Sequence, residues 1–502
     1  MNRLLFAAMF LAAIPGNNVG AQTFHTAMAP SPQPGTVFIY PERIPLQAGG
    51  MFTARRGLMF VPLNRSDPDS DVIAVEFYQF RSRNPNSNVP PIFMLQGGPG
   101  FEGLESVLKH LGTFERQFHG LRGVADVVVV GQRGIGSSKP STLIELKKPQ
   151  RRLDQPFDEE SWTNSFAASL SREKQFWVDQ GVDLGGYTVL EAAGDVHDIC
   201  RALGYEKLIA MGNSFGSHWA MAIMREYPNV VARAVLAGLE GPDQTWDHPG
   251  WIWNAFKRVA DDAENDAELA KLIPDGGLIR AIESMVRKAD AEPFTVVLNQ
   301  GTQEERRVLI DGHAMRSLAR GYSGNLKARP ADVIRMGRGD FADAAKTIVA
   351  RSSPRDRVFQ TASKFLLNCA SGASARKQSE FGSDAALHII GDPNLSIATA
   401  TQIWDVDLGD DFREEFHTDV PTILIHGTWD EITPYENAVE LKSSFSNGHL
   451  VTVKRGSHNA MPEAFAANRH FARGVFKFML TGDVSGLPRA VELPPAQWVI
   501  PE

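Results

Sequence analysis

The stretch Gly212-Asn213-Ser214-Phe215-Gly216 decides the fold. It directly follows an apolar run at 208–211 and precedes a stretch at 217–227 that predicts a helix ended by a proline. Strand, G-x-S-x-G turn and helix in this order are typical of a nucleophile elbow, whose sharp turn lifts the serine hydroxyl above the edge of a sheet. The glycines leave room for that strained turn. A glycine-rich turn that merely contains a serine is the alternative for this segment alone.

Two polar residues that would complete a catalytic triad follow Ser214 along the chain. Asp430 ends a glycine-containing loop after the apolar run 421–427, and His458 comes just after the strand pattern 449–453. Each lies past the carboxyl end of a predicted strand, the edge where open parallel sheets place their chemistry. The order serine, acid, histidine is that of α/β-hydrolases. His458 would take the proton of Ser214 and return it to the leaving group, and Asp430 would orient the imidazole.

Glu240 and Asp243 are the alternative acids, because they follow the strand pattern 234–237 and some hydrolases carry the acid there. Taken singly, His458 fits a surface loop and Asp430 fits a helix cap. Neither explanation accounts for both residues following strands in the required order. The sequence therefore favours Asp430.

A second glycine-rich segment predicts the oxyanion hole. The strand pattern 91–95 leads into Q-G-G-P-G at 96–100. A loop without side chains lets a backbone N–H of Gly97 or Gly98 approach the substrate and join the N–H of Phe215 around a tetrahedral oxyanion. A plain Gly/Pro turn is the alternative, and it is less consistent with a neighbouring triad.

These motifs and their order resemble the α/β-hydrolases of the proline iminopeptidase and tripeptidyl aminopeptidase type. That family carries H-G-G-P-G after its third strand, Q-R-G-x-G-x-S after its fourth, G-x-S-[YF]-G at the elbow and G-x-x-D-x-x-T-P-Y at the acid. The corresponding segments here are 96–100, 132–138, 212–216 and 427–435. The resemblance implies a mostly parallel eight-stranded sheet flanked by helices, with a helical lid inserted after the sixth strand.

The chain departs from the family pattern at three positions. Gln96 replaces the usual histidine, Gly131 stands where an aspartate commonly precedes Q-R-G, and Ser457 replaces the glycine before His458. None of these changes removes a triad group. Gln96 and Gly131 are expected to alter the floor of the site, and so to affect specificity more than catalysis.

The predicted organisation follows from the motifs. The segment 1–21 has a basic residue, an apolar stretch too short to span a membrane and small residues at its end, so it predicts a signal peptide and export to the periplasm or the medium. A Pro/Ser/Gly-rich segment follows. The βαβ rhythm is lost in the middle of the chain, where helical patterns predict the lid. The boundaries are 1–21 for the signal peptide, 22–36 for a flexible segment, 37–241 and 419–502 for the core, and 242–418 for the lid.

Composition excludes several classes of function. The net charge of −8 argues against a nucleic-acid binder, which would need a basic face. Neither H-E-x-x-H nor a closely spaced Cys/His set is present, so no metal is implied, and no organic cofactor is needed. The two cysteines, Cys200 and Cys369, would be compatible with one disulfide in an oxidising compartment. Cys200 lies in a helical pattern, which favours two packed thiols and leaves the bridge open.

In the resembled family the lid closes over the site and carries acidic groups that hold the free α-amine of the substrate. A buried ammonium needs a paired carboxylate, because desolvating it alone costs several kcal/mol. Glu240 and Asp243 are the candidates here, with Trp246, Trp251 and Trp253 as an aromatic wall. Helix capping by the acids and packing of the tryptophans beneath the lid fit the sequence equally well.

Three functions remain open. The first is an exported serine aminopeptidase that releases N-terminal residues or short peptides through an acyl-enzyme. The second is a carboxylesterase or related acyl hydrolase, whose triad would be identical because carbonyl chemistry does not reveal the leaving group. The third is a non-catalytic binding protein, which an intact triad and oxyanion loop disfavour. The expected partner is a peptide or small acyl substrate, without stable membrane insertion, and the oligomeric state is open.

Overall fold

The computed structural model describes residues 32–501 with the internal exceptions of 47–49, 85–86, 112–114, 137, 139–142, 145–151, 322–324, 353–359 and 415. The signal peptide predicted at 1–21 and most of the segment predicted at 22–36 lie outside the described residues. Among the described residues, no helix combines the length and the apolar character needed to cross a membrane.

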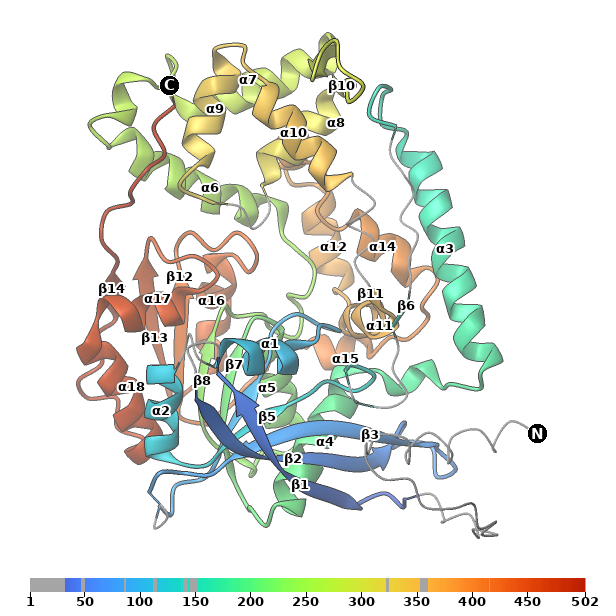
Figure 1. The fold of residues 1–502 in the computed structure, drawn as a ribbon, viewed down its shortest axis with the longest axis vertical. Helices are drawn as coiled ribbons and strands as arrows, with labels where there is room; N and C mark the ends of the chain where they lie inside the picture. The colour runs from blue at the N-terminus through green and yellow to red at the C-terminus, as the bar shows by residue number, and fades with distance from the viewer. Residues whose placement is uncertain are drawn as a thin grey trace.

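A ten-stranded sheet forms the lower half of the molecule (Figure 1). Its order is β1-β2-β3-β5-β4-β7-β8-β12-β13-β14. The pairs from β1 to β5 along this order are antiparallel, and all pairs from β5 to β14 are parallel. The strands are β1 Val37–Pro45, β2 Met51–Pro62, β3 Val72–Phe80, β4 Ile92–Leu95, β5 Val127–Val130, β7 Leu208–Asn213, β8 Val231–Ala237, β12 Thr422–Gly427, β13 Gly448–Lys454 and β14 Ala490–Glu492.

The sheet has two strands more than the eight expected. β2 to β13 supply the eight, with β8 as the sixth, while β1 pairs with one edge and β14 with the other. β14 is only three residues long, too short to give a period-two signal in the sequence. The order also contains a reversal: β5 lies on one side of β4 and β7 on the other. The loops that follow β4 and β7 therefore leave the sheet in opposite directions from adjacent strands, which is where open α/β sheets bind ligands.

Helices cover both faces of the sheet, and this explains why its central strands are apolar throughout. All four valines of β5 are buried, as expected for a strand covered on both sides. One face carries α4 Val189–Ala202 and α5 Phe215–Glu226, and the other carries α1 Gly103–His110, α2 Glu115–Val124, α17 Ala460–Ala467 and α18 Arg469–Thr481. Two separate apolar clusters, one on each face, form the core.

Between β8 and β12 the chain leaves the sheet and builds the upper half of the molecule (Figure 1). A third apolar cluster holds the far part of this lid together. The lid contains the antiparallel hairpin of β9 and β10, so it is not wholly helical as expected. Its elements are α6 Pro249–Glu264, η2 Leu269–Lys271, α7 Gly277–Ala291, β9 Phe294–Leu298, β10 Arg306–Ile310, α8 Gly312–Arg320, α9 Arg329–Gly337, α10 Ala342–Arg351, β11 Gln360–Thr361, α11 Ala362–Ser371, α12 Ala375–Gly382, α13 Leu387–Ile390, α14 Leu395–Thr401 and α15 Gly409–Arg413.

A second excursion from the core adds to the lid. It lies between β5 and α4 and comprises β6 Leu143–Ile144, α3 Glu159–Asp179 and η1 Leu184–Gly186. α3 packs against α14, and β6 pairs with β11. The single insertion expected from the sequence therefore describes only part of the upper half. After β12 the chain completes the core through α16 Tyr435–Leu441 and η4 Lys442–Ser444.

Cys200 and Cys369 are free, buried thiols on the same face of the sheet. Burial raises the pKa of each to about 12, so both stay protonated at neutral pH. They act as small apolar side chains in the core.

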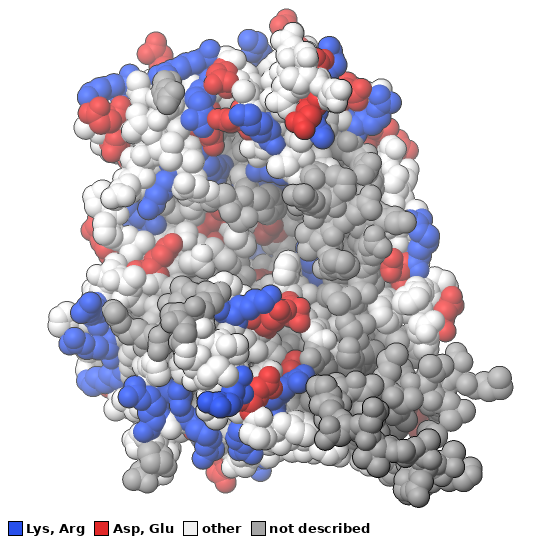
Figure 2. All heavy atoms as spheres, viewed as in Figure 1, with Lys and Arg blue, Asp and Glu red and all other residues white. Residues whose placement is uncertain are grey.

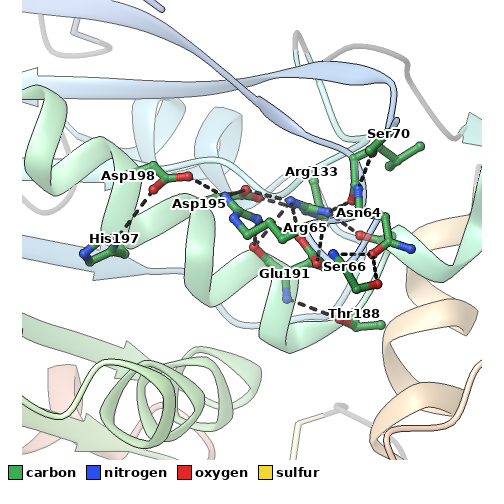
Figure 3. Close-up of polar contacts among 12 residues, drawn as sticks. Asn64, Arg65, Ser66, Ser70, Arg133, Thr188, Glu191, Asp195, His197 and Asp198 are labelled. Atoms are coloured by element: carbon green, nitrogen blue, oxygen red, sulfur yellow. Dashed lines mark hydrogen bonds and ion pairs between the residues drawn. The ribbon is translucent and has the colours of Figure 1, made fainter. Parts of the chain in front are cut away.

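The arginine of the Q-R-G motif is the centre of a buried charged network (Figure 3). Arg133 and Asp195 are each 1% exposed and form a two-pronged ion pair, with Nε–Oδ2 at 2.8 Å and a terminal nitrogen 2.7 Å from Oδ1. Arg133 also donates to the carbonyls of Leu63 and Gly186. Arg65, from the segment after β2, pairs with Asp195, Glu191 and Asp198. The network thus ties the loop after β5 to α4 and to the end of β2.

Replacing Arg133 with Met is expected to lower the free energy of unfolding by about 3–5 kcal/mol, because it leaves the Asp195 carboxylate buried without its main partner. Arg65→Met is the matched control: the Arg65 side chain is 23% exposed, and Asp195 keeps Arg133 in that variant. We expect a clearly smaller loss for the control in urea denaturation. Equal losses would show that Arg133 contributes no more to the network than Arg65 does.

Candidate active site

Ser214 lies directly after β7 in a strained turn. Its φ of 56° and ψ of −130° fall outside the regions that side chains ordinarily adopt. The turn is packed tightly: a Cβ at Gly212 would overlap the carbonyl of Gly216, and one at Gly216 would overlap the carbonyl of Leu95 at the end of β4. The Ser214 N–H donates to the carbonyl of Ala237 at 3.0 Å. The turn therefore exists only because two glycines flank the serine and two neighbouring strands hold it.

His458 and Asp430 meet at the same edge of the sheet. His458 Nδ1 lies 2.9 Å from Asp430 Oδ2 and 3.1 Å from Oδ1. The imidazole lies over Gly238, where a Cβ would be 3.1 Å from its Cε1 atom and 3.3 Å from Asn213 Oδ1. The ring and the side chain of Asn213, the residue that precedes Ser214, thus both lie against Gly238. Its Nε2 atom makes no hydrogen bond to the described residues and is available to the serine hydroxyl, a contact that often closes only when substrate binds.

The surroundings of Asp430 keep it ionised. Its carboxylate accepts hydrogen bonds from the backbone N–H groups of Ile432 and Thr433 and from the Thr433 hydroxyl. Burial raises the pKa of Asp430, but the charge of His458 and these hydrogen bonds outweigh it, so the pKa lies below its ordinary value. For His458 the balance is opposite in sign. Burial lowers the pKa of His458, but Asp430 and, to a smaller extent, Glu240 raise it. The second effect is larger, so the pKa lies above 6.5.

The predicted oxyanion loop lies against the serine. A Cβ at Gly97 would be 2.7 Å from the Asn213 carbonyl and 3.1 Å from Ser214 Cβ. The N–H groups of Gly97 and Gly98 donate to no other described residue, and that of Phe215 belongs to the first turn of α5, where no helical acceptor exists. These donors are free to hold an oxyanion.

Gln132 of the Q-R-G motif supports this loop. Its Oε1 accepts from the N–H of Gly100 at 2.7 Å, and its Nε2 donates to the carbonyl of Gly98 at 3.0 Å. The sequence contained the motif, but nothing in it showed that the glutamine side chain reaches across to the loop after β4. Gly131 serves the backbone: a Cβ there would be 2.8 Å from the Glu76 carbonyl. An aspartate at this position would therefore not fit without a shift. The expectation that Gly131 alters the floor of the site stays a prediction.

His426 is a site residue that sequence analysis missed. It is fully buried on β12, donates from Nε2 to the carbonyl of Thr433 at 2.6 Å, and accepts at Nδ1 from the N–H of Leu239 at 3.1 Å. Burial lowers its pKa, which keeps the ring neutral. It joins the loop that carries Asp430, called the acid loop below, to Leu239, where the chain leaves β8. A single histidine before Gly427 gives no sequence signal of this role.

The two acids proposed for amine binding differ in their surroundings. The Asp243 carboxylate accepts hydrogen bonds from both the N–H and the hydroxyl of Ser374, each at 2.7 Å. Both of its oxygens are therefore already hydrogen-bonded at the start of α12. The Glu240 side chain is 8% exposed and accepts no hydrogen bond from any described residue. Burial raises its pKa to about 8, with Asp247 adding to the shift and His458 opposing it. Asp247 was not identified by sequence analysis. Burial also raises the pKa of its carboxyl, to about 7.

The tryptophans expected to form an aromatic wall mostly pack within the lid. Trp251 stacks on His248 at 4.4 Å, with Lys377 over its ring, and Trp253 stacks on Phe256 in the lid core. The interpretation of packing beneath the lid therefore holds for these two. Among the described residues, no three His, Cys, Asp or Glu side chains are placed to hold a metal ion.

Comparison with known proteins supports the same fold. Residues 90–270 match a family model described as alpha/beta hydrolase fold, and residues 396–486 match one described as TAP-like protein. The first segment contains Ser214, and the second contains Asp430 and His458. Together with the sheet order, these matches show that the chain has the α/β-hydrolase fold. The narrower resemblance to the proline iminopeptidase type stays a prediction.

Among curated proteins, the chain is 27% identical over 193 residues to the serine protease Hip1 of Mycobacterium tuberculosis, covering 37% of this chain and 36% of that protein. It is 23% identical over 204 residues to the putative hydrolase YuaR of Escherichia coli, covering 39% and 38%. The matches thus span little more than a third of these relatives. Among solved structures, an epoxide hydrolase from an endophytic Streptomyces aligns over 90% of this chain and 99% of that chain, with 13% identity and a TM-score of 0.35.

Asp430→Asn is expected to lower kcat about 10,000-fold, because an amide would hold His458 in the wrong tautomer while the geometry stays intact. Asp243→Asn is the control, since Asp243 contacts Ser374 and not His458. The control should keep kcat within a few-fold on a small acyl ester. Comparable losses in both variants would remove Asp430 from its assigned role.

The pH profile should follow His458, which must be neutral to act as a base. Its pKa is raised above 6.5, so kcat/KM should be fully developed only above that value and fall as the pH drops through it. The measurement is kcat/KM against pH on a neutral ester, whose substrate does not titrate. An acid limb centred below pH 6.5 would contradict the assigned geometry.

Proposed function

We propose that this protein is a serine aminopeptidase that acts through an acyl-enzyme. Ser214 attacks the scissile carbonyl as His458 takes its proton, and Asp430 stabilises the resulting imidazolium. The N–H groups of Phe215 and of Gly97 or Gly98 receive the developing oxyanion. His458 then donates its proton to the leaving amine, and water releases the acyl group by the reverse sequence.

The observation that carries the aminopeptidase proposal is the unpartnered Glu240 carboxyl beside His458. A buried carboxylate without hydrogen bonds is costly, and the raised pKa of about 8 shows that the neutral form is favoured when nothing is bound. An ammonium group would reverse this balance, because the ion pair favours the ionised carboxylate. Glu240 is therefore prepared to bind a cation close to the reacting centre, and the free α-amine of a peptide is such a cation at neutral pH.

Asp247 extends this acidic region. Its charge acts on Glu240, and its own pKa is affected by Asp430, which places it near the triad as well. On the face shown in Figure 2, the surface is hollowed between the lid above and the core below. A substrate held by its amine at Glu240 would place its first carbonyls near Ser214, which is the arrangement that an exopeptidase needs.

The relatives support the peptidase side of the proposal. Hip1 is named a serine protease, and it shares 27% identity with this chain over 193 residues. An acyl ester hydrolase on the same fold would use the same triad, but it would give Glu240 no ligand. We also propose that the protein is exported, on the basis of the signal peptide predicted at 1–21.

The test compares chromogenic amides with a free or an N-acetylated amine, beside a short-chain acyl ester. We expect the free-amine amides to be cleaved, the acetylated ones to be spared, and Ser214→Ala to be inactive. Glu240→Gln should raise KM for free-amine amides about 10- to 100-fold, the value of a charged hydrogen bond, and leave the ester within a few-fold. Asp243→Asn is the matched control and should change neither substrate selectively. Turnover of the ester alone would identify an esterase and overturn the proposal.

A further inference from the structure

The loop that carries Asp430 is held by the lid on both sides of that residue. The carbonyl of Thr428 accepts from Arg258 of α6 at 3.3 Å. Trp429 is buried within the apolar cluster of the lid. Glu431 forms an ion pair with Arg329 of α9. Asp430 itself is turned the other way, toward His458.

Arg329 is the most strongly held of these lid groups. Besides Glu431, it donates to the carbonyl of Ala319 at 2.6 Å, and its guanidinium lies 4.1 Å from the centre of the Phe256 ring. Both ends of the ion pair are shielded, with 13% of the Arg329 side chain and 6% of the Glu431 side chain exposed. Because the pair is shielded, removing Arg329 or Glu431 takes a buried counter-charge away from the other residue. The geometry of Glu431 therefore depends on where α9 lies.

The loop that carries His458 shares this support. Arg455 has a φ of 62°, one of three positive values among the described non-glycine residues, and Ser214 is another. Its N–H donates to Thr428 Oγ1 at 3.0 Å, and its guanidinium lies 3.2 Å from Asp262 of α6. The C-terminal segment adds Trp498, whose ring packs on Trp429 at 5.6 Å. The acid loop, the histidine loop and the lid are thus one connected unit.

We propose that Arg329 is a positioning residue, through which the seated lid aligns the catalytic acid. Arg329 holds Glu431, and Glu431 fixes the loop position from which the Asp430 carboxylate reaches His458 Nδ1. When α9 moves away, the loop loses this ion pair, and the acid shifts from the imidazole. This inference rests on the triad assigned under the proposed function. It adds that lid seating affects the chemical step as well as substrate access.

The magnitude follows from how steeply catalysis depends on alignment. A displacement of about 1 Å in a catalytic group costs on the order of 100-fold in rate. Arg329→Met should therefore lower kcat about 10- to 100-fold on a small ester. Its KM should stay within a few-fold, because a small ester needs no contact with α9.

Arg316→Met is the matched control. Arg316 forms an ion pair with Asp290 inside the lid, between α8 and α7, and its side chain touches no residue of the acid loop. The substitution is chemically the same, and it removes an arginine from the same lid. We expect kcat and KM of this variant to stay within two- to three-fold of the wild type, so any general loosening of the lid is measured separately.

A spectroscopic readout follows the alignment directly. The His458 Nδ1–H proton shared with Asp430 should give a strongly downfield proton NMR signal, assigned by its loss in Asp430→Asn. We expect the signal to be lost or broadened in Arg329→Met and retained in Arg316→Met. Arg329→Lys, which keeps the charge, should recover part of kcat and of the signal. Glu431→Gln tests the other partner and should lower kcat as well, even if Arg329→Met fails to fold.

The outcomes separate this inference from the proposed function. If the wild type shows neither Ser214-dependent turnover nor the downfield signal, the triad assignment fails, and the inference fails with it. If the wild type shows both, while folded Arg329→Met or Glu431→Gln keeps kcat and the signal, the positioning role alone is wrong. A change in KM with unaltered kcat, or equal losses in Arg316→Met, would also overturn it.

Discussion

The close packing of the elbow against the end of β4 is the constraint on which the rest of the site depends. Ser214 adopts its strained backbone only because Gly216 touches the Leu95 carbonyl and Gly212 touches the turn itself. That contact requires β4 and β7 to be neighbours, which the strand order provides. The same contact brings the loop after β4 to Ser214. It therefore positions both the predicted nucleophile and the predicted oxyanion donors. Strain of this kind persists because the surrounding structure over-determines it.

Buried polar groups then secure the loops that this packing brings together. Arg133 fixes the segment after β5 to α4, and its neighbour Gln132 holds the oxyanion loop through two hydrogen bonds. His426 does the same for the acid loop, joining it to the exit from β8. In each case a buried side chain links its own segment to a distant part of the chain through hydrogen bonds or ion pairs. Unsatisfied groups at these depths would cost more than the bonds contribute, so the loops are held in one arrangement.

The lid contributes to the site in two ways. Its first residues bring Glu240 close to His458 and Asp247 close to Asp430, and burial raises the pKa of both carboxyls more than the charges of His458 and Arg320 lower them. Its later helices hold the acid loop through Arg258 and Arg329. In the proposed function, the first feature binds the cationic amine of the substrate. In the further inference, the second connects the position of the lid to the triad.

The sequence alone was enough to predict the nucleophile, the acid, the histidine and the oxyanion loop, because each is specified locally: glycines that a tight turn requires, and polar residues that directly follow apolar strands. The same local rules predicted the parallel sheet and an inserted lid. They did not predict β14, the β9–β10 hairpin or the α3 excursion, whose short or exposed elements gain their order from packing. Only the tertiary structure decided that Asp243 accepts hydrogen bonds from Ser374, while the Glu240 carboxyl accepts none from the described residues. It alone paired Arg329 with Glu431, 102 positions apart, because contacts between distant segments leave no periodic trace in the chain.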